Sequence, residues 1–88
     1  MRHAALARHL SRRFNEISRQ ADVLDACAYE DHLRGIRAGS AVLRRRALDA
    51  LRDAGDLRFL AARYASAAET ARRLAARPVL SRPTEVTP

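Results

Sequence analysis

The sequence predicts an all-α protein of three helices, and three observations support this fold class. Alanine, arginine and leucine occupy 47 of the 88 positions, and all three have high helix propensity. Four Val, two Ile and three Gly are too few for a sheet with its turns. Apolar residues recur at alternating spacings of three and four, as on one helix face. We expect helices at about 3–29, 32–54 and 57–77 in one helical domain, residues 1–77, and a disordered tail at 78–88.

The first predicted helix carries one continuous apolar stripe. Its members form a heptad seam: Ala7, Leu10, Phe14, Ile17, Ala21, Leu24 and Ala28. The pattern stops at Asp31 and Gly35, which places the end of this helix near residue 29. The first 15 residues are rich in arginine and lack acids, as in a mitochondrial transit peptide. Because the stripe runs through them, we interpret them instead as the first helix of a bacterial cytoplasmic protein.

The second predicted helix has two alternative starting points. Its apolar stripe begins at Leu33 and continues to Ala54, with Asp31 in position to cap the helix N-terminus. In the alternative, Ser40 is the N-cap and residues 35–39 form a loop. We favour the longer helix because the stripe already begins at Leu33, although Gly35 and Gly39 would then lie inside it.

The third predicted helix follows a tight turn. Its stripe consists of Leu57, Leu60, Tyr64, Ala67, Ala71 and Leu74. Gly55 suits the position after a helix C-terminus, and Asp56 suits the next N-cap. Such a short connection makes the second and third helices an antiparallel hairpin. Pro78 ends the third helix, since the residue before proline disfavours helical geometry.

The charge of this chain points toward nucleic acid at first sight. All 17 basic residues are arginine, and the formal net charge is +7. Codon usage in a GC-rich genome would also replace lysine by arginine, and the arginines are spread along the sequence. Four helical i, i+4 pairs account for several of them: Arg12 with Glu16, Glu30 with Arg34, Arg45 with Asp49 and Glu69 with Arg73. We therefore interpret most of the charge as solvated helix surface.

Catalytic, metal and cofactor motifs are not apparent in the sequence. His3 and His9 are six residues apart, unlike the i, i+4 histidines of a zinc helix, and Cys27 is the only cysteine. Glu30-Asp31-His32 is the densest ionisable cluster, but adjacent residues point to different sides of a helix. Arginine interrupts every stretch long enough to cross a membrane. We expect a protein that is not an enzyme and binds no cofactor, small-molecule substrate or membrane.

Residues from about Leu33 to Ala75 resemble the helical hairpin of small type III secretion co-chaperones. The shared residues are Leu33-Arg34, the arginines at 45 and 46, a short turn, Phe59-Leu60, the Ala-rich stretch from Ala65 to Glu69, and Leu74. The resemblance implies that the hairpin docks on a larger tetratricopeptide-like chaperone. Together the two would sequester the amphipathic helix of a needle subunit in the cytoplasm, without chemistry.

A need for a protein partner also follows from the composition. A chain of this size buries only about 60–65% of the surface that its unfolded form exposes, and its 19 alanines add little buried area. We expect a helical protein-interaction module that binds a larger chaperone or associates with itself. The residues expected to contact the partner are Leu48, Leu57, Phe59, Leu60 and Tyr64. The alternative hypothesis is a basic helical protein that binds nucleic acid, and a third is a subunit of a small homo-oligomeric helical enzyme.

Overall fold

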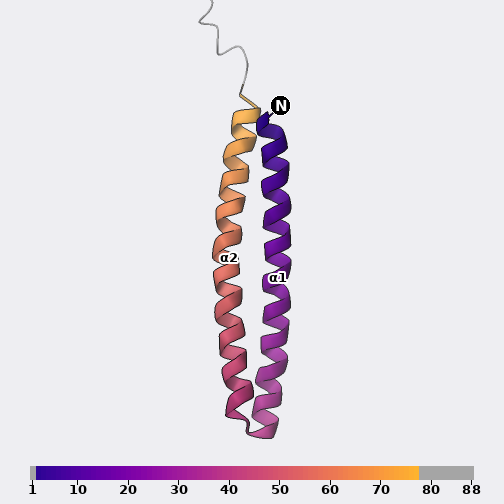
Figure 1. The fold of residues 1–88 in the computed structure, drawn as a ribbon, viewed down its shortest axis with the longest axis vertical. Helices are drawn as coiled ribbons and strands as arrows, with labels where there is room; N and C mark the ends of the chain where they lie inside the picture. The colour runs from indigo at the N-terminus through magenta and orange to yellow at the C-terminus, as the bar shows by residue number, and fades with distance from the viewer. Residues whose placement is uncertain (1, 78–88) are drawn as a thin grey trace, which may run out of the picture.

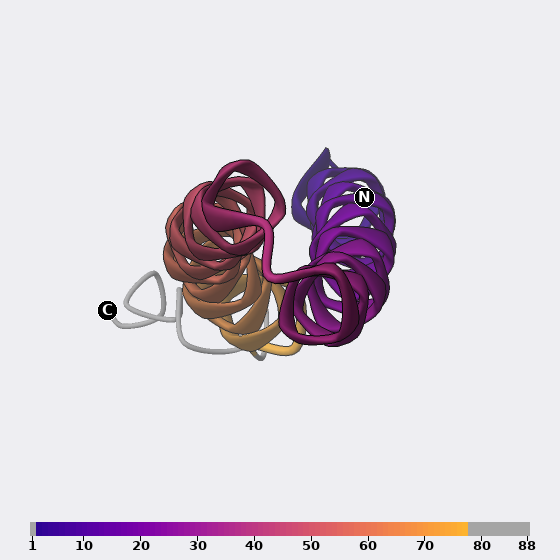
Figure 2. The same cartoon turned by 90° about the horizontal axis from the view of Figure 1, so that it is seen from below.

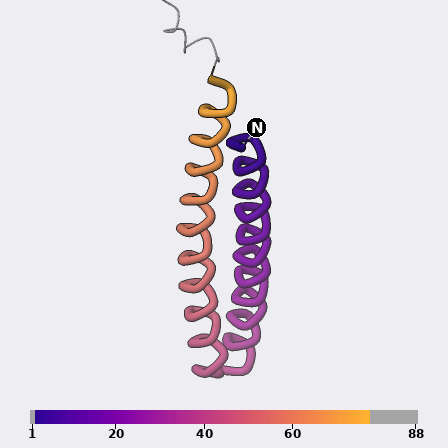
Figure 3. The backbone as a smooth tube through the Cα atoms, turned by 45° about the horizontal axis from the view of Figure 1, so that its top comes forward, coloured from indigo at the N-terminus to yellow at the C-terminus, as the bar shows by residue number. Residues whose placement is uncertain are grey.

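The protein is a hairpin of two long antiparallel helices. A computed structural model describes residues 2–77, in which α1 spans Arg2–Ala38 and α2 spans Ala41–Ala75 (Figure 1). At 1.5 Å per residue each helix is more than 50 Å long. The start of α1 and the end of α2 lie together at the open end, and the connection forms the turn end (Figure 3). The all-α fold and an antiparallel hairpin are confirmed, but the number of helices is two and not three.

The break between the helices lies at Gly39 and Ser40. Gly39 has a φ of 64°, in the left-handed region that glycine tolerates best. The Ser40 N–H donates to the Gly35 carbonyl at 2.9 Å, and the Gly39 N–H donates to the Ile36 carbonyl at 3.4 Å, as in a Schellman motif. The Ser40 hydroxyl then accepts the Leu43 N–H at 3.2 Å and caps α2. The favoured helix start near Leu33 is therefore wrong, and Ser40 is the N-cap, as in the alternative prediction. The loop expected at 35–39 is not formed, because residues 35–38 belong to α1.

The predicted turn at Gly55 and Asp56 is wrong. Both residues lie inside α2, which continues from Ala41 to Ala75 without a break. A glycine inside a helix costs about 1 kcal/mol relative to alanine. A break would cost more, because each new helix end leaves up to four backbone groups without their helical hydrogen bonds. Gly55 has nothing within 4 Å of the position of a Cβ, so it faces open space and directs no turn.

The seam between the helices is built almost entirely from alanine. The buried apolar residues are Ala7, Ile17, Ala21 and Ala28 of α1 and Ala47, Ala54, Ala61, Ala68 and Ala71 of α2. The stripe predicted for the first helix is confirmed. In α2, however, Ala61 and Ala68 occupy the seam, whereas the prediction placed Leu60 and Ala67 there. Small side chains allow the axes of two packed helices to approach more closely than larger side chains would.

The seam continues through the two residues at which the predicted first helix stops. Asp31 is 8% exposed, and its carboxylate lies 3.4 Å from the Arg46 guanidinium and 3.9 Å from that of Arg34. A Cβ on Gly35 would lie 2.7 Å from Cγ of Arg44 and 3.1 Å from its backbone nitrogen. Asp31 is therefore a buried ion-pair partner and not an N-cap, and Gly35 permits close approach of the helices beside the turn.

Polar contacts at the surface also join the two helices across the hairpin. The Arg58 guanidinium donates to Asp22 at 2.8 Å and lies 2.6 Å from the Asp25 carboxylate. The hydrogen bond to Asp25 raises the pKa of Arg58 above its usual value.

Seen from the turn end, the helices curve past one another along the hairpin (Figure 2). α2 ends at Ala75, and the predicted tail at 78–88 lies outside the described residues.

Candidate functional site: an apolar groove with a basic rim

The larger apolar side chains of the open end gather beside the seam and not in it. Leu6 and Leu60 each precede a buried seam residue by one position, and Leu74 follows the seam residue Ala71 by three, so all three share one flank of the hairpin. Leu10, Leu60, Tyr64 and Ala67 line one depression on this flank, and Val23, Leu24 and Leu57 line the next. We call this surface the apolar groove, and it consists of Leu6, Leu10, Val23, Leu24, Leu57, Leu60, Tyr64, Ala67 and Leu74.

Several groove residues keep much of their surface exposed. The exposed fraction is 46% for Leu6, 61% for Val23 and 41% for Leu60. Scattered apolar residues on a surface are normal, but a contiguous apolar patch marks a site of interaction. The hairpin by itself covers these side chains only in part, because alanine already fills the seam beneath them.

Arginines form the rim of the groove. The Arg13 guanidinium lies 5.7 Å from the centre of the Tyr64 ring and donates to Glu16 at 2.6 Å. This hydrogen bond raises the pKa of Arg13. Arg63 and Arg19 also line the depressions of the groove. Within residues 2–77, neither of these two arginines lies within ion-pair distance of a carboxylate, so both remain available to an acidic partner.

Folding concentrates the positive charge at the open end. We define the open half as residues 2–20 and 57–77, and the turn half as residues 21–56. The open half contains ten arginines and two glutamates, whereas the turn half contains six arginines and seven acidic residues. The formal charges are therefore +8 and −1. The arginines are spread along the sequence, but the antiparallel fold brings the two arginine-rich segments side by side in space.

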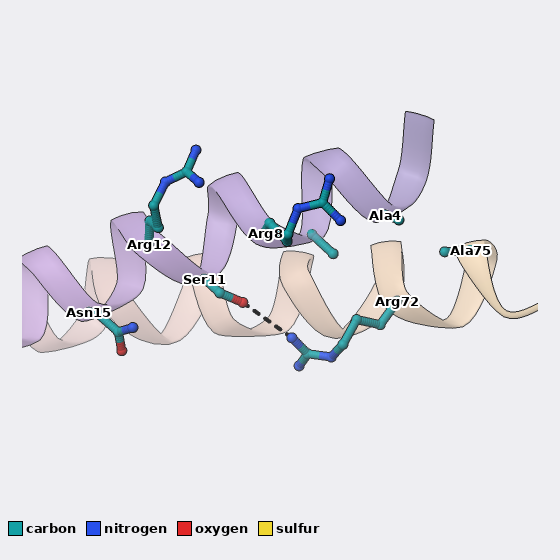
Figure 4. Close-up of a pocket in the computed structure, with 8 residues that line it drawn as sticks. Ala4, Arg8, Ser11, Arg12, Asn15, Arg72 and Ala75 are labelled. Atoms are coloured by element: carbon teal, nitrogen blue, oxygen red, sulfur yellow. Dashed lines mark hydrogen bonds between the residues drawn. The ribbon is translucent and has the colours of Figure 1, made fainter. Parts of the chain in front are cut away.

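A basic depression lies at the same end, near Arg8, Arg12 and Arg72. The Arg72 guanidinium donates to the Ser11 hydroxyl at 3.2 Å and to Glu69 at 2.9 Å. Figure 4 shows the side chains of Arg8 and Arg12 directed away from that of Arg72. Because the three guanidinium groups do not converge on one point, this depression is not a preformed site for a single phosphate.

The five predicted contact residues lie on three different surfaces. Leu57, Leu60 and Tyr64 belong to the apolar groove. Leu48 lies toward the turn end, in a separate depression with Tyr29 and Leu51. Phe59 is 69% exposed and lines none of these depressions.

Four residues of α1 that were not predicted as contact residues also contribute to the groove. These residues are Leu6, Leu10, Val23 and Leu24. The position of Leu6 directly before the seam residue Ala7 could have identified it. Leu10 and Leu24 had been assigned to the seam, where they are half-buried.

The residues considered for catalysis or metal binding do not form a site. Glu30 and His32 are exposed on either side of the buried Asp31. Within residues 2–77, no group of three or more His, Cys, Asp or Glu residues is placed to hold a metal ion. Neither α1 nor α2 contains an apolar stretch long enough to cross a membrane. No family model matches the chain, and no curated protein or solved structure is significantly similar to it.

Proposed function

We propose that the protein is a non-enzymatic helical interaction module whose apolar groove docks a helix of a partner protein. One observation supports this function: alanines fill the seam, while the leucines lie exposed beside it. Burial of a leucine side chain contributes about 1.5–3 kcal/mol when it is complete. In the hairpin alone Leu6, Leu60 and Leu74 stay 46%, 41% and 39% exposed, so part of this contribution is left for a helix laid in the groove to supply.

A cytoplasmic type III secretion co-chaperone is one specific form of this function. Such a protein would place its groove on a larger chaperone that holds a needle subunit. The resemblance included a short turn before Phe59, but this segment is continuous helix in α2. The apolar groove therefore supports a docking role, and it does so independently of the hairpin boundaries that the resemblance implied.

The test of the proposed function is a comparison of a groove variant with a matched control. The groove variant combines Leu6→Gln, Leu60→Gln and Leu74→Gln, and the control combines Val42→Gln and Phe59→Gln, two residues 70% and 69% exposed outside the groove. All proteins are isolated from the cells that make the natural chain. We expect wild type and control to retain one protein in stoichiometric amount, which raises their melting temperature, and the groove variant to lose it. A stable monomer that retains no such protein would refute the function.

The charge of the open half supports nucleic-acid binding as a second candidate function. Ten arginines on two adjacent helical segments resemble the footprint of a protein that contacts phosphates. Binding of this kind weakens steeply with salt, because it releases counterions. We would measure binding of duplex DNA and of single-stranded RNA between 50 and 200 mM NaCl. Failure to bind either nucleic acid at 50 mM would exclude this candidate.

A further inference from the structure

The apolar groove and its basic rim together specify the chemistry of a partner. This inference rests on the proposed docking function and names the kind of helix that the groove would accept. We propose that the occupant is an acidic amphipathic helix of about 18 residues. One face of this helix would carry leucine-like side chains, and the edges of that face would carry glutamate or aspartate.

The length of the occupant follows from the length of the groove. Its outermost described residues on α1 are Leu6 and Val23, which span 18 residues and about 25 Å. Seven of the nine groove residues line two depressions between the helices, and this shape accepts the ridge of a third helix. Leu6 and Leu74 extend the same flank toward the open end. A partner helix of about five turns would therefore cover the groove from one end to the other.

The charge of the occupant follows from the rim. Arg19 and Arg63 line the depressions and have no carboxylate within ion-pair distance among the described residues. They belong to the open half, whose formal charge is +8. Acidic side chains at the edges of the bound helix would meet these guanidinium groups, while a basic helix would meet like charge.

A second copy of this chain does not satisfy both requirements. If two open halves faced each other, each would bring a charge of +8 against the other. If the copies overlapped in opposite directions, the groove would face the turn half of the other copy. The corresponding positions there, each one residue before the seam, are Cys27, Arg34, Arg46 and Asp53. Three of these four side chains are charged, so they would not complete an apolar interface.

Three probes of defined composition test the proposal with the full chain. The first is a labelled 18-residue amphipathic peptide with leucines on one face and glutamates along its edges. The second keeps the leucines and replaces each glutamate by lysine. The third is a vesicle of phosphatidylcholine and phosphatidylserine. At 50 mM NaCl we expect the acidic peptide to bind at least tenfold more tightly than the basic peptide. This preference should shrink at 300 mM NaCl, because salt screens exposed charges.

Variants separate the apolar and the charged contributions to binding. Leu60→Gln combined with Leu74→Gln should weaken the acidic peptide at least tenfold. Arg19→Glu combined with Arg63→Glu should weaken the acidic peptide and strengthen the basic one. The control is Arg45→Glu in the turn half. Like each substitution of the rim variant, it replaces one arginine by a glutamate. This control should leave the ratio of the two affinities nearly unchanged, and circular dichroism of every variant verifies the helical fold.

Each alternative outcome refutes a different statement. Equal binding of both peptides that depends on Leu60 would refute the acidic partner and leave the docking function in place. Binding of neither peptide, together with retention of the co-isolated protein by the variant that combines Leu6→Gln, Leu60→Gln and Leu74→Gln, would refute both. Binding of vesicles at concentrations where neither peptide binds would assign the groove to a membrane surface and overturn the proposal.

Discussion

The position of the turn makes opposite predictions for two glycines of this chain. Gly55 lies inside α2 with nothing within 4 Å of the position of a Cβ, whereas Gly39 has a φ of 64° in the turn. Replacement of each by alanine adds the same methyl group in two different backbone conformations. We expect Gly55→Ala to stabilise the hairpin and Gly39→Ala to destabilise it.

The magnitudes follow from the backbone conformations. Alanine is favoured over glycine inside a helix by about 1 kcal/mol, and Gly55 offers no clash to offset this gain. The left-handed conformation costs a residue with a Cβ about 1–2 kcal/mol, so Gly39→Ala should lose a similar amount. For a domain of this size, 1 kcal/mol corresponds to a shift of about 4–8 °C in the melting temperature.

The measurement is thermal unfolding followed by circular dichroism at 222 nm, at several protein concentrations so that any association is visible. We expect the melting temperature of Gly55→Ala to lie about 5 °C above wild type and that of Gly39→Ala about 5 °C or more below it. A three-helix arrangement with its turn at Gly55 requires the reverse order. A lower melting temperature for Gly55→Ala, with little change for Gly39→Ala, would therefore refute the two-helix hairpin.

Three further predictions concern the seam and the ion pairs. Ala61→Leu should overpack the seam and cost about 1–3 kcal/mol in urea unfolding, while Ala62→Leu on the exposed surface should have little effect. Arg46→Ala should cost about 1 kcal/mol, because it removes the closer guanidinium partner of the nearly buried Asp31; equal stability of variant and wild type would contradict this role. The pKa of Glu69 is lowered by hydrogen bonding to a neighbouring arginine, so its stabilising effect is present above about pH 4.3 and is lost as the pH falls below it. The melting temperatures of wild type and Glu69→Gln should accordingly converge near pH 3, and a gap that widened there would show the sign to be wrong.

Parts of the hairpin seam could be predicted from the sequence. The spacing of Ala7, Ile17, Ala21 and Ala28 identified the buried face of α1 correctly. In α2 the same method favoured Leu60 over its neighbour Ala61, because burial of a leucine normally contributes more than burial of an alanine. The structure buries Ala61 instead, since close approach of the two backbones provides contacts along the full length of the hairpin.

The candidate site could be predicted only in part. Leu57, Leu60 and Tyr64 were identified from α2, but the groove also requires Leu10 and Leu24 from α1. Which residues of α1 lie opposite these depends on where the chain reverses. Because the turn was predicted at Gly55, the groove residues of α1 and those of α2 were not expected to be neighbours.

The sequence by itself determined the helical fold class, the heptad period of the first helix and the excess of arginine. These are local properties, because helix propensity and spacing act over a few residues. The tertiary structure decided where the hairpin turns: Gly39 takes the left-handed conformation there, and Ser40 caps the start of α2. It also decided that the leucines lie beside the seam and that the arginine-rich segments at both ends of the described chain lie side by side. Both outcomes depend on which segments are neighbours in space, and one turn position fixes all of those neighbours at once.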